Sequence, residues 1–253
     1  MDESLSVDLN CDLGESFGRY ELGQDAAIMP LVTSANVACG FHAGDPSVMR
    51  STVQLVKQNK VALGAHPGYP DLQGFGRRQI DLTSREVTDI VTYQVGALAA
   101  YATAEGIKLV HVKPHGALYN LASKDFVVAK AIAQAVHEID PSLILVGLAG
   151  SVLVKAGEER GLKVANEGFP DRAYLPNGQL MPRTQDGAVI HQPQIVAANA
   201  LRLVKQGLIV KGKKVQIDTL CLHGDNLNAV ENARVVRLAL EKGGVRISSP
   251  LRS

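Results

Sequence analysis

Short runs rich in apolar residues recur along the chain and alternate with longer segments of helical periodicity. The runs are typical of strands and span residues 6–13, 34–39, 61–65, 108–113, 143–148, 163–167 and 219–223. In the segments between them, apolar residues recur at helical spacing, as Val87, Val91 and Leu98 do. This alternation predicts βαβ units and a parallel sheet.

Capping residues indicate where several helices begin and end. Asp45 followed by Pro46 is an N-cap with proline at the first helical position, and Thr83 with Glu86 forms a capping box. Gly106 ends the helix that Thr83 opens. Further helices are predicted at residues 123–138, 151–160, 193–206 and 227–242.

Polar residues occupy one face of several predicted strands. Asp8, Asn10 and Asp12 alternate with apolar residues in the first strand, and Thr219 and Cys221 do so in the last. These strands therefore have one apolar face, against which helices can pack, and one polar face. This pattern predicts a closed (β/α) barrel, in which the polar face points inward and leads to the active site. The alternative is an antiparallel sheet with one wet face, which helix-length connections disfavour. A dinucleotide-binding fold is disfavoured because no strand is followed by GxGxxG.

Composition narrows the class of protein. The 253 residues hold 26 Lys and Arg against 25 Asp and Glu, a net charge of +1, so we expect no binding to nucleic acid or an anionic membrane. With 46% hydrophobic and 20% charged residues, the chain has ordinary globular proportions. No linker rich in Pro and Ser divides it, so we expect the barrel to form a single domain over residues 1–253. No apolar run suits a membrane span and no signal peptide is evident, so the expected location is cytoplasmic.

Two further features predict structural roles. Cys11, Cys39 and Cys221 form no CxxC motif, and we interpret them as small buried residues in a reducing compartment. Residues 207–214 match GxxxxGK, but lysine stands where Ser or Thr should hold magnesium, and the segment follows a helix. We interpret it as a turn, which leaves the chain without a phosphate-binding loop.

Histidines gather where the predicted strands end. His42, His66, His111, His115 and His223 lie on these strands or just after them. Parallel α/β folds place their sites at this edge, so the histidines are candidates for acid, base or ligand roles.

Asp12, His42 and His66 come from three adjacent strands and are therefore candidate ligands of a divalent metal that activates water. The alternative is a metal-free site in which Asp12 or a histidine deprotonates water and Lys113 stabilises an oxyanion. The catalytic candidates are Asp12, His42, His66, Lys113 and His115. Polar residues of the same loops are candidates for substrate binding: Glu15, Asp45, Arg77, Glu167, Arg172, His223 and Asp225.

Six motifs in order resemble the LamB/YcsF family. They span residues 8–15, 36–45, 64–71, 113–119, 171–174 and 221–225, and the resemblance runs from about residue 6 to residue 247. It implies a deformed seven-stranded (β/α) barrel similar to that of polysaccharide deacetylases.

The resemblance also implies an activity, because characterised members of the family are the A component of the prokaryotic ATP-dependent 5-oxoprolinase. The implied reaction opens 5-oxo-L-proline to L-glutamate and hydrolyses ATP to ADP and phosphate. Two partner subunits, called B and C, are implied, with ATP bound mainly by them. Two alternatives remain open, a metal-dependent deacetylase of carbohydrate amides and a non-catalytic lactam-binding regulatory subunit.

Overall fold

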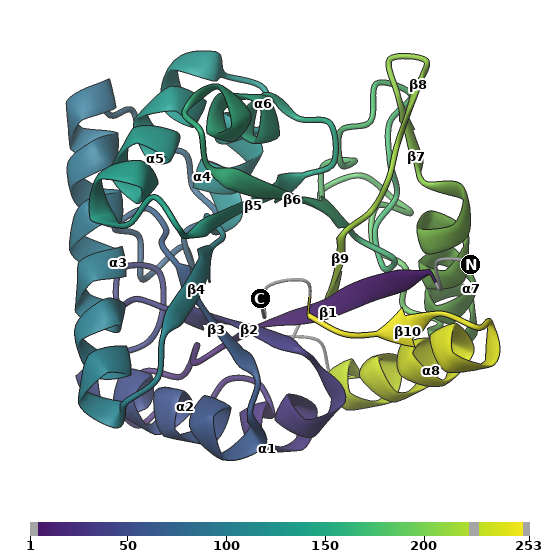
Figure 1. The fold of residues 1–253 in the computed structure, drawn as a ribbon, viewed down its shortest axis with the longest axis horizontal. Coiled ribbons are helices and arrows are strands. Elements are labelled where there is room, and N and C mark those ends of the chain that lie inside the picture. The colour runs from purple at the N-terminus through teal and green to yellow at the C-terminus, as the bar shows by residue number, and fades with distance from the viewer. Residues whose placement is uncertain (1–4, 223–227, 250–253) are drawn as a thin grey trace.

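Seven parallel strands close into a barrel in the computed structural model, which describes residues 5–222 and 228–249 (Figure 1). Strand β9 pairs with both β6 and β1, which closes the barrel. The short β10 (Arg246–Ile247) pairs with the beginning of β1. In order around the barrel the strands are β1 (Ser6–Leu13), β2 (Ser34–Ala38), β3 (Ala62–His66), β4 (Leu109–Val112), β5 (Ile144–Leu148), β6 (Lys163–Gly168) and β9 (Thr219–Leu222).

The closed barrel predicted from the sequence is confirmed. The bounds of all seven barrel strands lie within one residue of the predicted runs. Every pairing between these strands is parallel, so the antiparallel alternative is wrong. The helix-length connections explain this result, because a strand can be joined to a parallel neighbour only through a long crossover connection.

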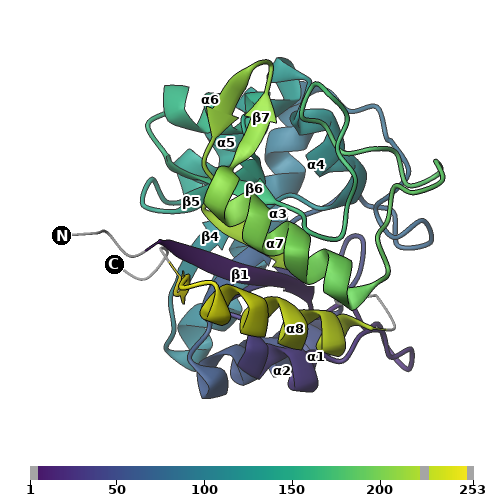
Figure 2. The same cartoon turned by 90° about the vertical axis from the view of Figure 1, so that its right-hand side faces the viewer.

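Helices wrap the outside of the barrel, and α7 and α8 lie side by side on one flank (Figures 1 and 2). A short α1 (Asp25–Ile28) and a 3₁₀ turn, η1 (Met29–Leu31), precede β2. The longer helices are α2 (Pro46–Asn59), α3 (Ser84–Glu105), α4 (Gly116–Ala122), α5 (Phe126–Ile139), α6 (Val152–Glu159), α7 (Pro193–Gln206) and α8 (Ala229–Lys242).

Helix ends follow the capping signals of the sequence. The Asp45 side chain accepts hydrogen bonds from the backbone at the start of α2, and the capping box of Thr83 and Glu86 opens α3. The helix predicted over residues 123–138 is confirmed as α5, which begins three residues later, whereas the short α4 before it was not predicted. The Asp125 side chain caps the start of α5 and thereby separates the two.

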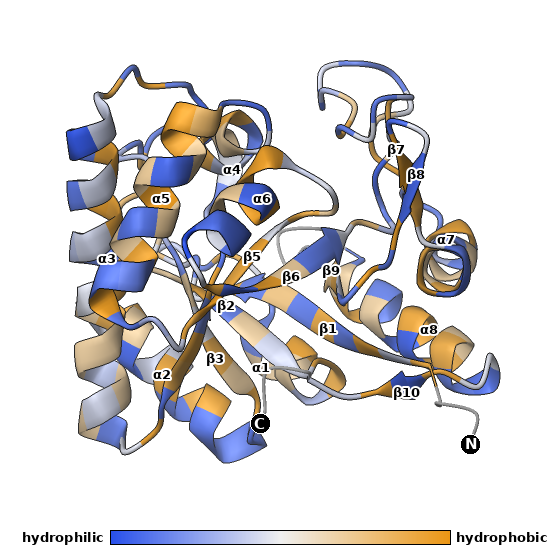
Figure 3. Ribbon diagram, turned by 45° about the horizontal axis from the view of Figure 1, so that its top comes forward, coloured by the Kyte–Doolittle hydropathy of each residue, from blue (hydrophilic) through white to orange (hydrophobic). Residues whose placement is uncertain are grey.

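The core lies between the strands and the surrounding helices. Hydrophobic and hydrophilic residues alternate along β1 (Figure 3), and its Leu9, Cys11 and Leu13 are buried in the core. Burial of each such aliphatic side chain contributes about 1.5–3 kcal/mol. Cys39 and Cys221 are also buried, and all three cysteines are free thiols, as predicted. The outward residues thus stabilise the barrel and leave the inward positions to polar side chains.

A small hairpin stands outside the barrel. Strands β7 (Leu208–Val210) and β8 (Lys213–Val215) pair antiparallel across Lys211 and Gly212, which both have positive φ. Such a two-residue connection suits the twist of a hairpin, so the interpretation of residues 207–214 as a simple turn missed its flanking strands. No helix within residues 5–222 and 228–249 is long and apolar enough to span a membrane.

Candidate active site

Polar residues at the carboxyl ends of the barrel strands point inward and meet around one lysine. Lys113 follows β4, and its Nζ lies 2.9 Å from Asp12 Oδ1 of β1 and 2.8 Å from Glu167 Oε1 of β6. Its third neighbour is Cys221 Sγ of β9, at 3.0 Å. Tyr119 of α4 donates from its hydroxyl to the other Glu167 oxygen, Oε2, at 2.7 Å. All these side chains are buried.

This arrangement keeps Lys113 charged. Burial alone would lower the pKa of the ammonium group, but the Asp12 and Glu167 carboxylates outweigh it and hold the pKa well above its ordinary value. Burial raises the pKa of the Cys221 thiol, which therefore stays protonated at neutral pH. Cys221 is thus a neutral acceptor for the ammonium group and no candidate nucleophile.

A buried amide network holds Asp12 in place. Asn36 donates from Nδ2 to Asp12 Oδ1 at 2.8 Å and to Asn10 Oδ1 at 2.7 Å. His111 Nε2 lies 2.7 Å from Asn36 Oδ1 and must donate, because an amide oxygen only accepts. Gly64 makes room for this ring, since a Cβ there would overlap it. Burial lowers the pKa of His111 to about 3, so the ring is a neutral structural donor.

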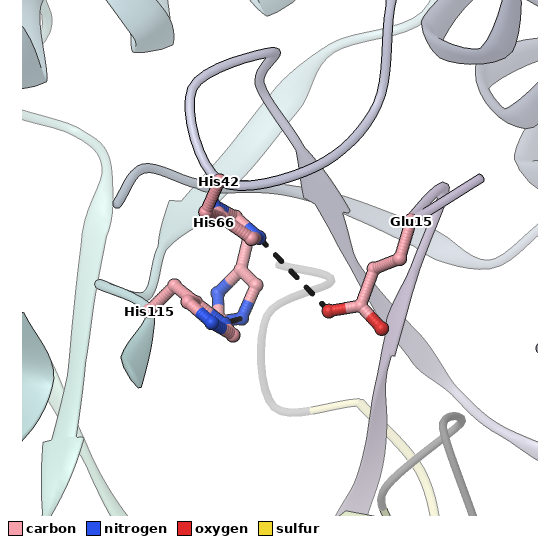
Figure 4. A group of neighbouring side chains, drawn as sticks. All are labelled: Glu15, His42, His66 and His115. Carbon is pink, nitrogen blue, oxygen red and sulfur yellow. Dashed lines mark hydrogen bonds and ion pairs between the residues drawn. The ribbon is translucent and has the colours of Figure 1, made fainter. Parts of the chain in front are cut away.

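A histidine cluster, formed by Glu15, His42, His66 and His115, adjoins Asp12 (Figure 4). The rings of His42 and His115 are stacked with centroids 3.8 Å apart, and the His66 ring stands nearly perpendicular to both. His115 Nδ1 lies 3.0 Å from His66 Nε2, which is 3.3 Å from Asp12 Oδ2. His42 Nε2 lies 3.9 Å from Glu15 Oε1. The cluster therefore joins the ends of several strands.

Two rings of the cluster, His42 and His115, favour the neutral form. Burial lowers the pKa of His42 well below its ordinary value, and the neighbouring His115 and His66 lower it further. Burial, followed by the neighbouring His66, lowers the pKa of His115 to about 3. Neutral imidazole nitrogens are the form that binds metal ions or accepts a proton.

A cavity of about 540 Å³ opens above these groups. Its polar floor holds Asp12, Glu15, His66, Lys113 and His115. Further up, the lining includes the cations Arg77, Lys124, Arg172 and Arg183 and the aromatic side chains Phe75, Tyr119 and Phe169. The volume lies in the range of about 300–1,000 Å³ that is usual for small-molecule sites. The cationic wall suits an anionic ligand.

The structure brings together most of the residues predicted for the site. Seven of them line the cavity, namely Asp12, Glu15, His66, Arg77, Lys113, His115 and Arg172. His42 lies behind His115, and Glu167 lies behind Lys113. The metal set of Asp12, His42 and His66 stays a prediction, because the structure groups His42 and His66 with Glu15 and His115 and places Asp12 beside them.

Other predicted residues have different surroundings. Asp45 caps α2 with one carboxylate oxygen and accepts from the Gly18 backbone at 2.7 Å with the other. Arg172 donates to the carbonyl oxygens of Ala188 and Met181, so part of its guanidinium group holds the loop above the cavity. His223 and Asp225 lie outside the described residues.

Two residues of the site were given no role from the sequence. Asn36 binds Asp12, and Tyr119 binds Glu167. The alternation of Ser34 and Asn36 in the second predicted strand is the same signal that singled out Asp12, and it could have identified Asn36. Tyr119 lies on a helix that the sequence did not predict, so it gave no comparable signal.

The model of the LamB/YcsF family matches residues 7–253. The chain belongs to the LamB/YcsF family. The six motifs that predicted this membership supply most of the site, and the family match confirms the resemblance drawn from them.

Known LamB/YcsF proteins resemble the chain over nearly its full length. A relative from Syntrophobacter fumaroxidans, named as the A component of 5-oxoprolinase, is 53% identical over 247 residues, which are 96% of this chain and 98% of the relative. The crystal structure of a lactam utilization protein from Thermus thermophilus superposes with a TM-score of 0.89 at 50% identity, covering 96% of this chain and 99% of that one.

A more distant likeness concerns the fold alone. Peptidoglycan deacetylase PdaC from Bacillus subtilis superposes with a TM-score of 0.50 at 9% identity, covering 98% of this chain and 89% of that one. The expected similarity to the barrel of polysaccharide deacetylases is therefore confirmed.

Proposed function

We propose that the chain is the A component of an ATP-dependent 5-oxoprolinase, which acts in the cytoplasm. The reaction opens the cyclic amide of 5-oxo-L-proline to give L-glutamate and hydrolyses ATP to ADP and phosphate. The observation that carries the proposal is the pairing of Lys113 with Asp12 on the floor of a cavity with a cationic wall, with Glu167 behind Lys113. The choice of substrate comes from the name of relatives that align over nearly the whole chain.

Asp12 is the proposed general base. Its Oδ1 is held by Lys113 and Asn36, while Oδ2 lies beside His66 Nε2. A carboxylate fixed in this way can take a proton from water and direct the oxygen at the ring carbonyl carbon. His66, with His42 and His115 beside it, completes the polar side of the site.

Lys113 is the proposed stabiliser of the oxyanion. Its raised pKa keeps the ammonium group charged, and its buried position spares that charge the screening of bulk water. Arg77 is exposed at the cavity rim, with its guanidinium group 4.9 Å from the centre of the Phe75 ring. We assign to Arg77, with Arg172 deeper in the wall, the binding of the substrate carboxylate.

The proposed role of ATP is to activate the lactam, which is a poor electrophile. In the proposed sequence, the B and C components bind ATP and transfer its terminal phosphoryl group to the lactam oxygen. Water then attacks the ring carbon on this chain, the C–N bond breaks and the nitrogen takes a proton, which yields a glutamyl phosphate. A second water releases phosphate and leaves glutamate.

The test is glutamate release from 5-oxoproline and ATP by the purified chain, by the B and C components from the same source, and by the three together. We expect glutamate only in the full mixture. The chain alone cannot activate the lactam with ATP, and the B and C components alone lack the site that opens the ring. The control is a known A component mixed with the same B and C.

If this control makes glutamate and the full mixture does not, the proposal is wrong. Deacetylation of carbohydrate amides without ATP would then favour the first alternative function. Lactam binding that survives the Asp12→Ala substitution would favour the regulatory one.

A further inference from the structure

The backbone fixes the hydrogen atoms of two rings in the histidine cluster. His66 Nδ1 lies 2.7 Å from the carbonyl oxygen of Lys113, and His115 Nε2 lies 2.8 Å from that of Phe75. A carbonyl oxygen only accepts hydrogen bonds, so each of these nitrogens carries its ring's hydrogen. In a neutral imidazole the other nitrogen, His66 Nε2 or His115 Nδ1, is then a bare acceptor.

The two bare nitrogens face each other. His66 Nε2 and His115 Nδ1 lie 3.0 Å apart, and Asp12 Oδ2 is a further acceptor 3.3 Å from His66 Nε2. Lone pairs at such distances repel unless a positive charge lies among them. Either a shared proton or a metal ion supplies that charge.

His42 provides an independent observation that favours a metal ion. Its side chain is completely buried, and neither ring nitrogen has a hydrogen-bond partner within residues 5–222 and 228–249. The ring is held in place by its stacking on His115 and by the backbone of Gly68, where an added Cβ would come within 2.7 Å of His42 Nδ1. A buried nitrogen held without a partner is costly unless a ligand satisfies it.

We propose that Glu15, His42, His66 and His115 bind a divalent transition metal ion of the zinc class. Their donor atoms all lie within 4.8 Å of one another, whereas the ligands of a tetrahedral site with bonds of about 2.1 Å lie about 3.4 Å apart, so the side chains must close around the ion by up to about 1.4 Å. Imidazole nitrogens with one carboxylate suit zinc, iron, nickel or copper better than magnesium or calcium.

The carbonyl oxygens on His66 and His115 strengthen this assignment. Histidines that bind metal ions almost always donate their other ring N–H to a carbonyl or a carboxylate, as both rings do here. The proposed site stands independently of the 5-oxoprolinase reaction, because it rests on donor atoms and their hydrogen-bond partners alone.

The test is titration of the chelator-treated full chain with Zn²⁺ by calorimetry, with Co²⁺ absorption as a second readout of the ligand field. We expect one equivalent to bind with submicromolar affinity and to raise the melting temperature. Mutation of a residue that only hydrogen-bonds to a metal ligand typically weakens metal binding by about 10- to 100-fold. Loss of a direct ligand should have a larger effect, so we expect His42→Ala to weaken zinc binding by at least about 100-fold. Glu15→Gln removes the charge but keeps a carbonyl oxygen that can still coordinate the ion, so it should weaken binding less, by at least about 10-fold.

The exposed His191 gives the matched control, and His191→Ala should bind Zn²⁺ like the wild type. Substoichiometric binding by the wild type would overturn the proposal and leave a proton shared between His66 and His115. Unchanged affinity in a folded Glu15→Gln variant would overturn it as well. Zinc binding without glutamate formation would reject the proposed reaction alone, whereas glutamate formation without zinc binding would reject the metal site alone.

Discussion

Replacing Lys113 by methionine is expected to destabilise the barrel by about 3–5 kcal/mol, because two buried carboxylates lose their shared cation. Lys113 is 3% exposed and bridges Asp12 and Glu167 across the barrel interior. The same change removes the proposed oxyanion donor and should lower glutamate formation by at least about 100-fold. Urea unfolding measures the first effect, and the reconstituted 5-oxoprolinase reaction measures the second.

A double variant and a surface control separate the causes. Lys113→Met with Glu167→Gln removes one of the uncompensated charges and should recover part of the stability but none of the activity. Lys130→Met breaks only exposed contacts, an ion pair of 4.0 Å with Glu159 and a cation–π contact of 4.5 Å with Phe126, and should change stability by no more than about 1 kcal/mol. A Lys113→Met protein as stable as the wild type would show that the buried ion pairs do not hold the barrel together.

Replacing Asp12 by asparagine is expected to lower the kcat/KM for glutamate formation by about 10²–10⁴-fold, the usual range for a lost general base. Asparagine keeps the size of the side chain, and Lys113 keeps Glu167 as its partner. The loss of stability should therefore be smaller than for Lys113→Met. Steady-state kinetics in the full mixture, alongside urea unfolding, measure both quantities.

Asp89→Asn is the matched control, because Asp89 is an exposed aspartate on the outer surface of α3. It should leave both activity and stability unchanged. Near-normal activity of a folded Asp12→Asn variant would remove Asp12 from the mechanism.

The barrel could be predicted from the sequence because its cause lies in short-range patterns. In the first strand, polar residues at Asp8, Asn10 and Asp12 alternate with apolar residues, which requires a strand with one polar and one apolar face. This signal involves only residues that are neighbours in the sequence. The capping signals at Asp45 and Thr83 are local too, and both were correct. Helix α4 was missed because His115, at its N-cap position, makes no side-chain capping hydrogen bond and therefore gives no such signal.

The partners within the site could not be read in the same way, because they depend on where loops return. The positive φ of Gly14 turns the chain after β1 and brings Glu15, rather than Asp12, to His42. The stacking of His42 on His115 joins loops after β2 and β4. No spacing in the sequence encodes such a contact, whereas the inward direction of Lys113 followed from its strand.

The most direct measurement follows ADP and glutamate together in one mixture of this chain with the B and C components, using either the wild type or the Asp12→Asn variant of the chain. With the wild type we expect equal amounts of both products, because each activated lactam is opened. With Asp12→Asn we expect ADP to continue forming while glutamate nearly stops, because activation occurs on the partners and ring opening at Asp12. Glutamate that keeps pace with ADP in the variant, at the wild-type rate, would contradict the assignment of ring opening to this site.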